Sequence, residues 1–122
     1  MFATALLMLG SLVSQTDNEV QSCIKHVNHA RKQAGLNELV VDAKLMQTSQ
    51  SWSNSQQRRG RMSHGPHTGW SGECVAWGAS TGHDVFGMWW RSPGHHNIMM
   101  GRGARKIGVG RAGTFWTLQT GH

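Results

Sequence analysis

The chain has 122 residues and a net charge of +6, with 12 lysine and arginine side chains against six acidic ones. This length holds one domain and excludes a second independent core. Residues 58–122 carry eight basic side chains against Glu73 and Asp84 alone. A basic C-terminal half of this kind favours binding to anionic partners. The alternative is that its glycine-rich basic segments are simply loops exposed to solvent. The sequence argues against nucleic acid, because neither stacking aromatic residues nor a groove-reading helix accompanies the basic residues.

Residues 1–15 contain no charged side chain and include an apolar run from Phe2 to Val13. The run is too short to cross a bilayer as a helix and is typical of the core of a secretory signal. No lysine or arginine precedes it, and the alternative is a helix or strand packed on the domain. The sequence predicts a signal peptide over 1–15 and a domain over 16–122. The processed protein is expected to be secreted, periplasmic or in the cell envelope, and not integral to a membrane.

Capping and glycine signals predict four helices in the rest of the chain. The predicted starts are Thr16, Asp42, Thr81 and Ser92, and the first two helices end at Gly35 and Gly60. Thr16 forms a capping box with Glu19, and apolar residues recur at helical spacing after it. Ser92 precedes a proline, which suits the first helical position. This start places His95 in the first turn of the last helix.

The clear strands come last in the chain. Residues 106–111 and 114–120 are predicted to form a hairpin across Ala112 and Gly113. The segment 73–79 is short and apolar enough to form a buried strand or a turn of helix. Residues 36–41 are expected to form an extended link between the first two helices. Helices precede strands without regular alternation, so we expect an α+β fold with a mainly antiparallel sheet.

Three residues in different segments are candidates for chemistry. His64 lies in a glycine-flanked loop, Glu73 opens the next apolar segment, and His95 begins a helix. Two imidazoles and a carboxylate form a set that can hold a catalytic zinc with an open position. A lone histidine is more often a hydrogen-bonded structural residue. The chain has no HExxH, no CxxC pair and no GxSxG elbow, so the zinc hypothesis depends on whether the three residues converge.

Five segments in order resemble a CAP (SCP-like) domain, the superfamily of cysteine-rich secretory proteins, antigen 5 and pathogenesis-related proteins. They are VNHARKQAGLNELVVDAKL, MSHGP, GECVAWG, WWRSPGHHNIMM and KIGVGRAGTFWTLQT. GECVAWG resembles the family's GENxAxG, and SPGHHN is similar to the bacterial SPGHRxN. The resemblance spans about Asn18 to Gln119. It implies a three-layer α-β-α sandwich with a central antiparallel sheet and an open cleft lined by His64, Glu73 and His95.

The resemblance also implies structural roles for Asn28, Arg31 and Trp89. Two departures from the family pattern bear on the cleft. Ser92 stands where many eukaryotic members have a second glutamate, which weakens the attraction for a divalent cation. Cys74 stands where GEN has asparagine. Cys74 and Cys23 form a disulfide that closes a loop of about fifty residues, or both are free thiols.

The resemblance implies a secreted recognition protein, since some members bind lipids or sterols. Its cleft would bind an extracellular or envelope ligand, namely a lipid, an anionic polysaccharide or a peptide, with or without Zn²⁺ or another divalent cation. The alternative is a zinc-dependent hydrolase in which His64 and His95 hold the metal and bound water has a pKa of about 7. Glu73 would then be the general base or a third ligand. A thiol nucleophile at Cys74 is disfavoured because the neighbouring carboxylate repels a thiolate.

Overall fold

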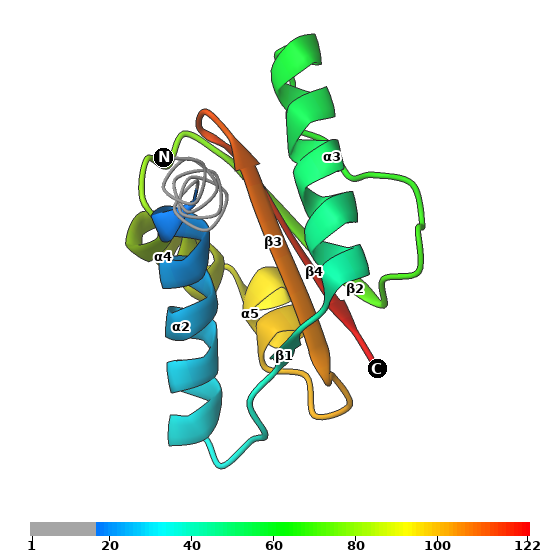
Figure 1. The fold of residues 1–122 in the computed structure, drawn as a ribbon. Helices are drawn as coiled ribbons and strands as arrows, with labels where there is room; N and C mark the ends of the chain where they lie inside the picture. Colours follow the sequence, from blue (N-terminus) through cyan, green and yellow to red (C-terminus); the bar gives the residue numbers. More distant parts are fainter. Residues whose placement is uncertain (1–16) are drawn as a thin grey trace, which may run out of the picture.

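The computed structural model describes residues 17–122, so the predicted signal peptide and Thr16 lie outside the described residues. The elements are α2 (Asn18–Gln33), β1 (Val40–Val41), α3 (Ala43–Arg59), β2 (Gly72–Trp77), α4 (Gly82–Trp90), α5 (Pro93–Met99), β3 (Lys106–Ala112) and β4 (Phe115–Gly121). Figure 1 shows α3 on one face of the sheet and α2, α4 and α5 on the other. The predicted α+β fold and three-layer sandwich are confirmed. Within residues 17–122, no helix has both the length and the apolar character needed to span a membrane.

The predicted start and end of α3 and the predicted start of α4 are confirmed by their caps. The Asp42 carboxylate accepts a hydrogen bond from the backbone N–H of Leu45 over 3.0 Å. Gly60 ends α3 in the left-handed region with φ of 61°, which glycine adopts without strain. The Thr81 hydroxyl accepts from the N–H of Asp84 over 3.1 Å at the start of α4. Local side-chain chemistry therefore sets both helices.

The cap of α2 differs from the prediction. Asp17 is the capping residue, and its carboxylate accepts from the N–H of Val20 over 3.2 Å. Glu19, the predicted partner of Thr16 in a capping box, accepts from the N–H of Gly82 over 2.9 Å, and Thr16 itself lies outside the described residues. The two helices approach closely here, because a Cβ on Gly82 would lie 2.1 Å from the Glu19 carbonyl oxygen. Glu19 thus joins α2 to α4.

The sheet has the strand order β1-β3-β4-β2. The predicted hairpin forms between β3 and β4, with Gly113 at a φ of 59° in the turn. Residues 72–77 form a strand, not a turn of helix, and β2 pairs antiparallel with β4 so that Glu73 lies opposite Gln119. The extended link contributes β1, which pairs parallel with β3. The sheet is mainly antiparallel, as predicted, and β2 is one of its two edges.

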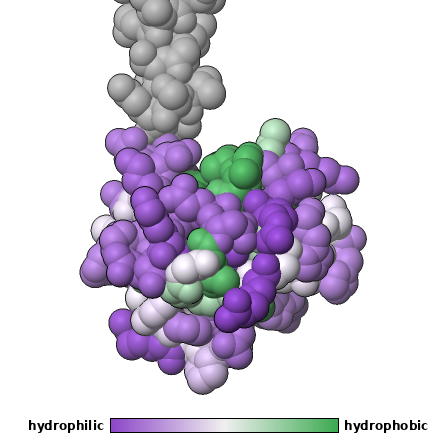
Figure 2. Space-filling view, turned by 90° about the horizontal axis from the view of Figure 1, so that it is seen from below, coloured by the Kyte–Doolittle hydropathy of each residue, from purple (hydrophilic) through white to green (hydrophobic). Residues whose placement is uncertain are grey.

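The face of the sheet toward α2, α4 and α5 holds the apolar core. Its largest fully buried apolar side chains are Trp89, Trp116, Met99, Ile107 and Leu118. The Trp89 indole N–H donates to the carbonyl of Val75 over 3.1 Å, which confirms a core role for this residue. On the face that Figure 2 shows, the surface is mainly hydrophilic and hydrophobic residues gather only in small areas.

Polar side chains of α2 form hydrogen bonds to the backbone of segments that surround this core. Asn28 accepts from the N–H of Leu39 over 2.7 Å and donates to its carbonyl over 3.0 Å. The Arg31 guanidinium is buried and donates to the carbonyls of Met99 and Gly101 over 3.0 and 2.8 Å. Burial, with the nearby charge of Arg105, lowers the pKa of Arg31. The structural roles implied for Asn28 and Arg31 are confirmed.

The face toward α3 is packed mainly by small and polar side chains, beside Leu45, the one apolar residue among the buried residues of α3. Gly108 and Gly110 of β3 let the helix backbone touch the strand, because a Cβ on Gly108 would lie 2.1 Å from the carbonyl carbon of Leu45. Ser49 and Ser53 are fully buried and donate to the carbonyls of these two glycines over 3.2 and 3.0 Å. Glycines and buried hydroxyl groups therefore join α3 directly to the sheet.

Candidate functional site: a histidine–glutamate pair beside an apolar pocket

The loop that carries His64 is held by α3. The Trp52 indole N–H donates to the carbonyl of Ser63 over 2.7 Å, and the Gln56 side-chain oxygen accepts from the N–H of Ser63 over 3.1 Å. The Trp52 ring also packs on Gly65, where a Cβ would come within 2.8 Å of it. Both neighbours of His64 are therefore fixed, so the imidazole starts from a defined backbone position.

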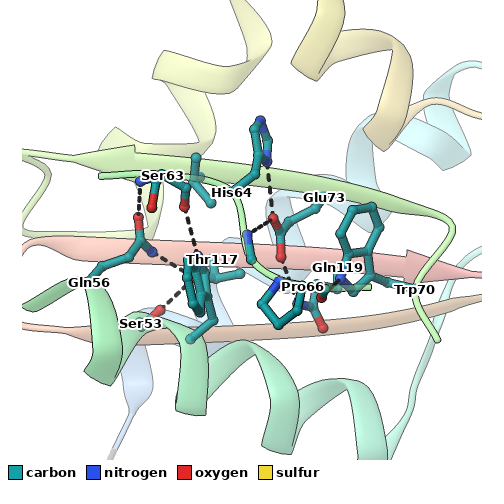
Figure 3. Close-up of polar contacts among 12 residues, drawn as sticks. Ser53, Gln56, Ser63, His64, Pro66, Trp70, Glu73, Thr117 and Gln119 are labelled. Carbon is teal, nitrogen blue, oxygen red and sulfur yellow. Dashed lines mark hydrogen bonds and ion pairs between the residues drawn. The ribbon is translucent and has the colours of Figure 1, made fainter. Parts of the chain in front are cut away.

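Glu73 orients His64. The Glu73 side chain is fully buried, whereas that of His64 is 61% exposed. One carboxylate oxygen lies 3.0 Å from His64 Nδ1 and accepts from the N–H of Gly65 over 2.8 Å. The other accepts from the Gln119 amide over 2.8 Å. Figure 3 shows the His64 ring and the Glu73 carboxylate pointing toward one another. His64 Nδ1 is occupied, so its Nε2 is the nitrogen left for a ligand.

His95 lies in α5, as predicted, and its pKa is influenced by the charge of His64. Burial, and secondly the charge of His64, lower the pKa of His95 from 6.5. Its Nδ1 lies 2.9 Å from the Ser92 hydroxyl, and Ser92 makes no side-chain hydrogen bond to the helix end. His95 is consequently a neutral imidazole at pH 7, with Nε2 free of these contacts.

The three predicted residues do not assemble a metal site with three protein ligands. Within residues 17–122, no group of three or more histidine, cysteine, aspartate and glutamate side chains is placed to hold a metal ion. Glu73 is surrounded by three hydrogen-bond partners and is buried, so it is not placed as a third ligand or as a base that reaches substrate. Metal binding by the two imidazoles alone stays a prediction.

An apolar pocket of about 460 Å³ includes His95 in its wall. Its lining residues are Gly60, Arg61, Met62, Val75, Ala76, Trp77, Met88, Trp89, Ser92, His95 and Phe115. Trp77 is 60% exposed and Met62 is 49% exposed, so large apolar side chains of the pocket meet solvent. Sequence reasoning missed this pocket because its residues come from separate segments, and it also missed Gln119.

Both cysteines are buried free thiols, so the structure corresponds to the second of the two predicted alternatives. Burial raises the pKa of Cys23 to about 12. The pKa of Cys74 is also raised, by burial first and then by the charges of Cys23 and Glu73. Cys74 is part of the apolar core. Neither sulfur is a thiolate at neutral pH, so neither is a nucleophile.

The model of the Cysteine-rich secretory protein family, CAP, matches residues 24–116. The chain belongs to the CAP family. This match covers well over half of the sequence and includes His64, Glu73 and His95. No curated protein sequence matches the chain.

Solved structures of bacterial proteins share the fold. An extracellular protein with an SCP domain from Bacillus anthracis superposes with a TM-score of 0.79 at 21% identity, over 85% of this chain and 40% of that one. An outer surface protein from Borrelia burgdorferi gives a TM-score of 0.76 at 19% identity, over 88% of this chain and 96% of that one. This CAP domain therefore spans less than half of the first protein and nearly all of the second.

Proposed function

We propose that this CAP domain is an extracellular or envelope binding module for a single-chain amphiphile with an anionic head. The observation that carries the proposal is the position of His95, a polar group in the wall of an otherwise mainly apolar pocket. Ligand pockets commonly combine apolar walls with a few placed polar groups, and 460 Å³ lies in the usual range of about 300–1,000 Å³. Apolar walls favour a lipid-like ligand over a polysaccharide.

Charge and hydrogen bonding at the pocket suit an anionic head. Arg61 lines the pocket together with His95, and a guanidinium binds carboxylate or phosphate in bidentate geometry. The head would meet Arg61 and the free Nε2 of His95, while the apolar chain would contact Met62, Trp77 and Met88.

Two further observations support an extracellular location. The B. anthracis and B. burgdorferi proteins of the same fold are described as extracellular and as an outer surface protein. Residues 1–15 have the uncharged, apolar character of a secretory signal. Export would also bring the domain to envelope lipids.

Titration of the full chain with sodium palmitate, followed by tryptophan fluorescence and calorimetry, tests the proposal. Trp77→Ala should weaken binding at least tenfold, which corresponds to about 1.4 kcal/mol, because it removes a large apolar wall. Trp70→Ala is the matched control, since Trp70 does not line the pocket and bonds to the carbonyl of Pro66. Equal palmitate affinity in the Trp77 variant and the wild type, or no binding at all, would refute the proposal.

Zinc and ester assays separate binding from hydrolysis. A palmitate ester is offered to the wild type and to His64→Ala, with and without zinc, and metal content is measured beside a His64→Ala/His95→Ala double variant. Binding without turnover, with equal metal content in wild type and double variant, is the expected result. Zinc-dependent turnover that is lost in His64→Ala would replace the binding module by the hydrolase.

A further inference from the structure

A chain of hydrogen bonds runs from α3 through β4 to the candidate site. The Thr48 hydroxyl lies 2.6 Å from the Gln119 side-chain oxygen, and the Gln119 amide donates to Glu73 over 2.8 Å. Glu73 in turn lies 3.0 Å from His64 Nδ1. Figure 3 shows Gln119 and His64 on different sides of the Glu73 carboxylate. The chain thus links a residue of the helix layer to the imidazole.

The donors and acceptors of this chain have one consistent direction. Thr48 donates to Gln119, which leaves the Gln119 NH₂ group to face Glu73. A reversed amide would place its oxygen against a carboxylate oxygen, and two acceptors repel. The carboxylate accepts from the Gly65 N–H as well, and an ionised carboxylate only accepts. His64 must therefore carry its proton on Nδ1, which leaves the lone pair on Nε2.

Burial makes this arrangement depend on Gln119. Gln119 is 1% exposed and Glu73 is 2% exposed, so water does not replace a lost donor. The Gln119 amide is the hydrogen-bond partner of the second Glu73 carboxylate oxygen, so without it this buried oxygen is left unsatisfied and the carboxylate rotates. Rotation weakens the hold of the other oxygen on His64 Nδ1.

We propose that Gln119 and Thr48 are positioning residues that fix the Nδ1–H tautomer of His64. They do not touch the ligand and act only through Glu73. The exposed Nε2 lone pair is then an acceptor for a donor group of the ligand, such as a hydroxyl, and this role rests on the proposed function. The tautomer itself does not, since it follows from contacts within the protein.

The test is ¹H–¹⁵N NMR of the histidine rings in the full chain at about pH 8.5, where imidazoles are neutral. Wild-type His64 should be mainly the Nδ1–H tautomer. In Gln119→Met the share of this tautomer should fall at least twofold, toward the Nε2–H form that free imidazole side chains prefer. Thr48→Val, which keeps side-chain volume and removes only the hydroxyl, should shift the tautomer in the same direction by less.

Ser49→Ala is the matched control. It removes a buried hydroxyl beside Thr48, but the Ser49 hydroxyl donates to the carbonyl of Gly108 and takes no part in the hydrogen bonds from Thr48 to His64. It should lower stability and leave the His64 tautomer unchanged. A His64 tautomer in Gln119→Met that equals that of Ser49→Ala would overturn the proposal, and if Gln119→Met does not fold, Thr48→Val decides by the same criterion. Failure of palmitate binding would leave this result untouched, so the two proposals fail separately.

Discussion

The contact between α3 and β3 gives a quantitative prediction for Gly108→Ala. The new Cβ would lie 2.1 Å from the Leu45 carbonyl carbon and 2.3 Å from its oxygen. Ordinary contact begins at 3.4 Å, so α3 must withdraw by about 1.3 Å, the difference between 3.4 and 2.1. The atoms in the way belong to backbone, and no rotamer change relieves the overlap.

Withdrawal of α3 has a calculable cost. The hydrogen bonds of Ser49 and Ser53 to β3, at 3.2 and 3.0 Å, would both exceed hydrogen-bonding distance. Two buried hydrogen bonds contribute about 2 kcal/mol together, and overpacking adds about 1–3 kcal/mol. The free energy of unfolding should fall by about 3–5 kcal/mol, a large part of the roughly 5–15 kcal/mol of a typical domain.

Urea unfolding followed by tryptophan fluorescence measures this loss. Gly94→Ala is the matched control, since no atom lies within 4 Å of the added Cβ and Gly94 is in α5. Alanine there should raise stability by about 0.5 kcal/mol, because glycine is the poorer helix former. A Gly108→Ala protein within about 0.5 kcal/mol of wild type would refute the close packing of α3 on β3.

Three further predictions use the same protein. Arg31→Met should lower the free energy of unfolding by about 3 kcal/mol, because buried carbonyls lose a charged donor, and an equal loss in Lys32→Met, a change at an exposed neighbour, would contradict this. His95 has a lowered pKa in the fold, so the unfolded chain binds the proton first; its contribution to stability is full above about pH 6.5 and is lost as pH falls through the lower folded-state pKa. The wild type should therefore lose more stability than His95→Gln between about pH 7 and about pH 5, and equal losses in urea titrations would count against the burial of His95. A thiol reagent should not modify the native chain and should modify Cys23 and Cys74 after denaturation without reductant, because both are buried; absence of free thiol at that stage would show that the two are bridged.

The elements with local signals were predictable from the sequence. Asp42 and Gly60 mark the ends of α3 by side-chain and backbone chemistry that acts within four residues. The hairpin of β3 and β4 and the cap at Thr81 are of the same kind. The resemblance to the CAP family placed His64, Glu73 and His95, and the contact of His64 with Glu73 agrees with that placement.

The remaining features depend on long-range contacts. In β4, Thr117 and Gln119 alternate with Trp116 and Leu118, a pattern typical of a strand with one face in water. The structure buries both faces, because the serine-rich side of α3 covers the polar one. The role of Gln119 follows from a partner 46 positions away in the chain, and no periodic pattern shows such a pair. The two-residue strand β1 likewise exists only through its pairing with β3.

The strand β4 serves two purposes through alternate residues. Trp116 and Leu118 lie in the apolar core, while Thr117 and Gln119 belong to the polar side that supports the His64 loop. Substitutions at every second position of β4 can therefore alter the support of His64 while the apolar core keeps its composition. A slip of one residue in strand pairing would exchange the two sides and disrupt both the core and the support of His64.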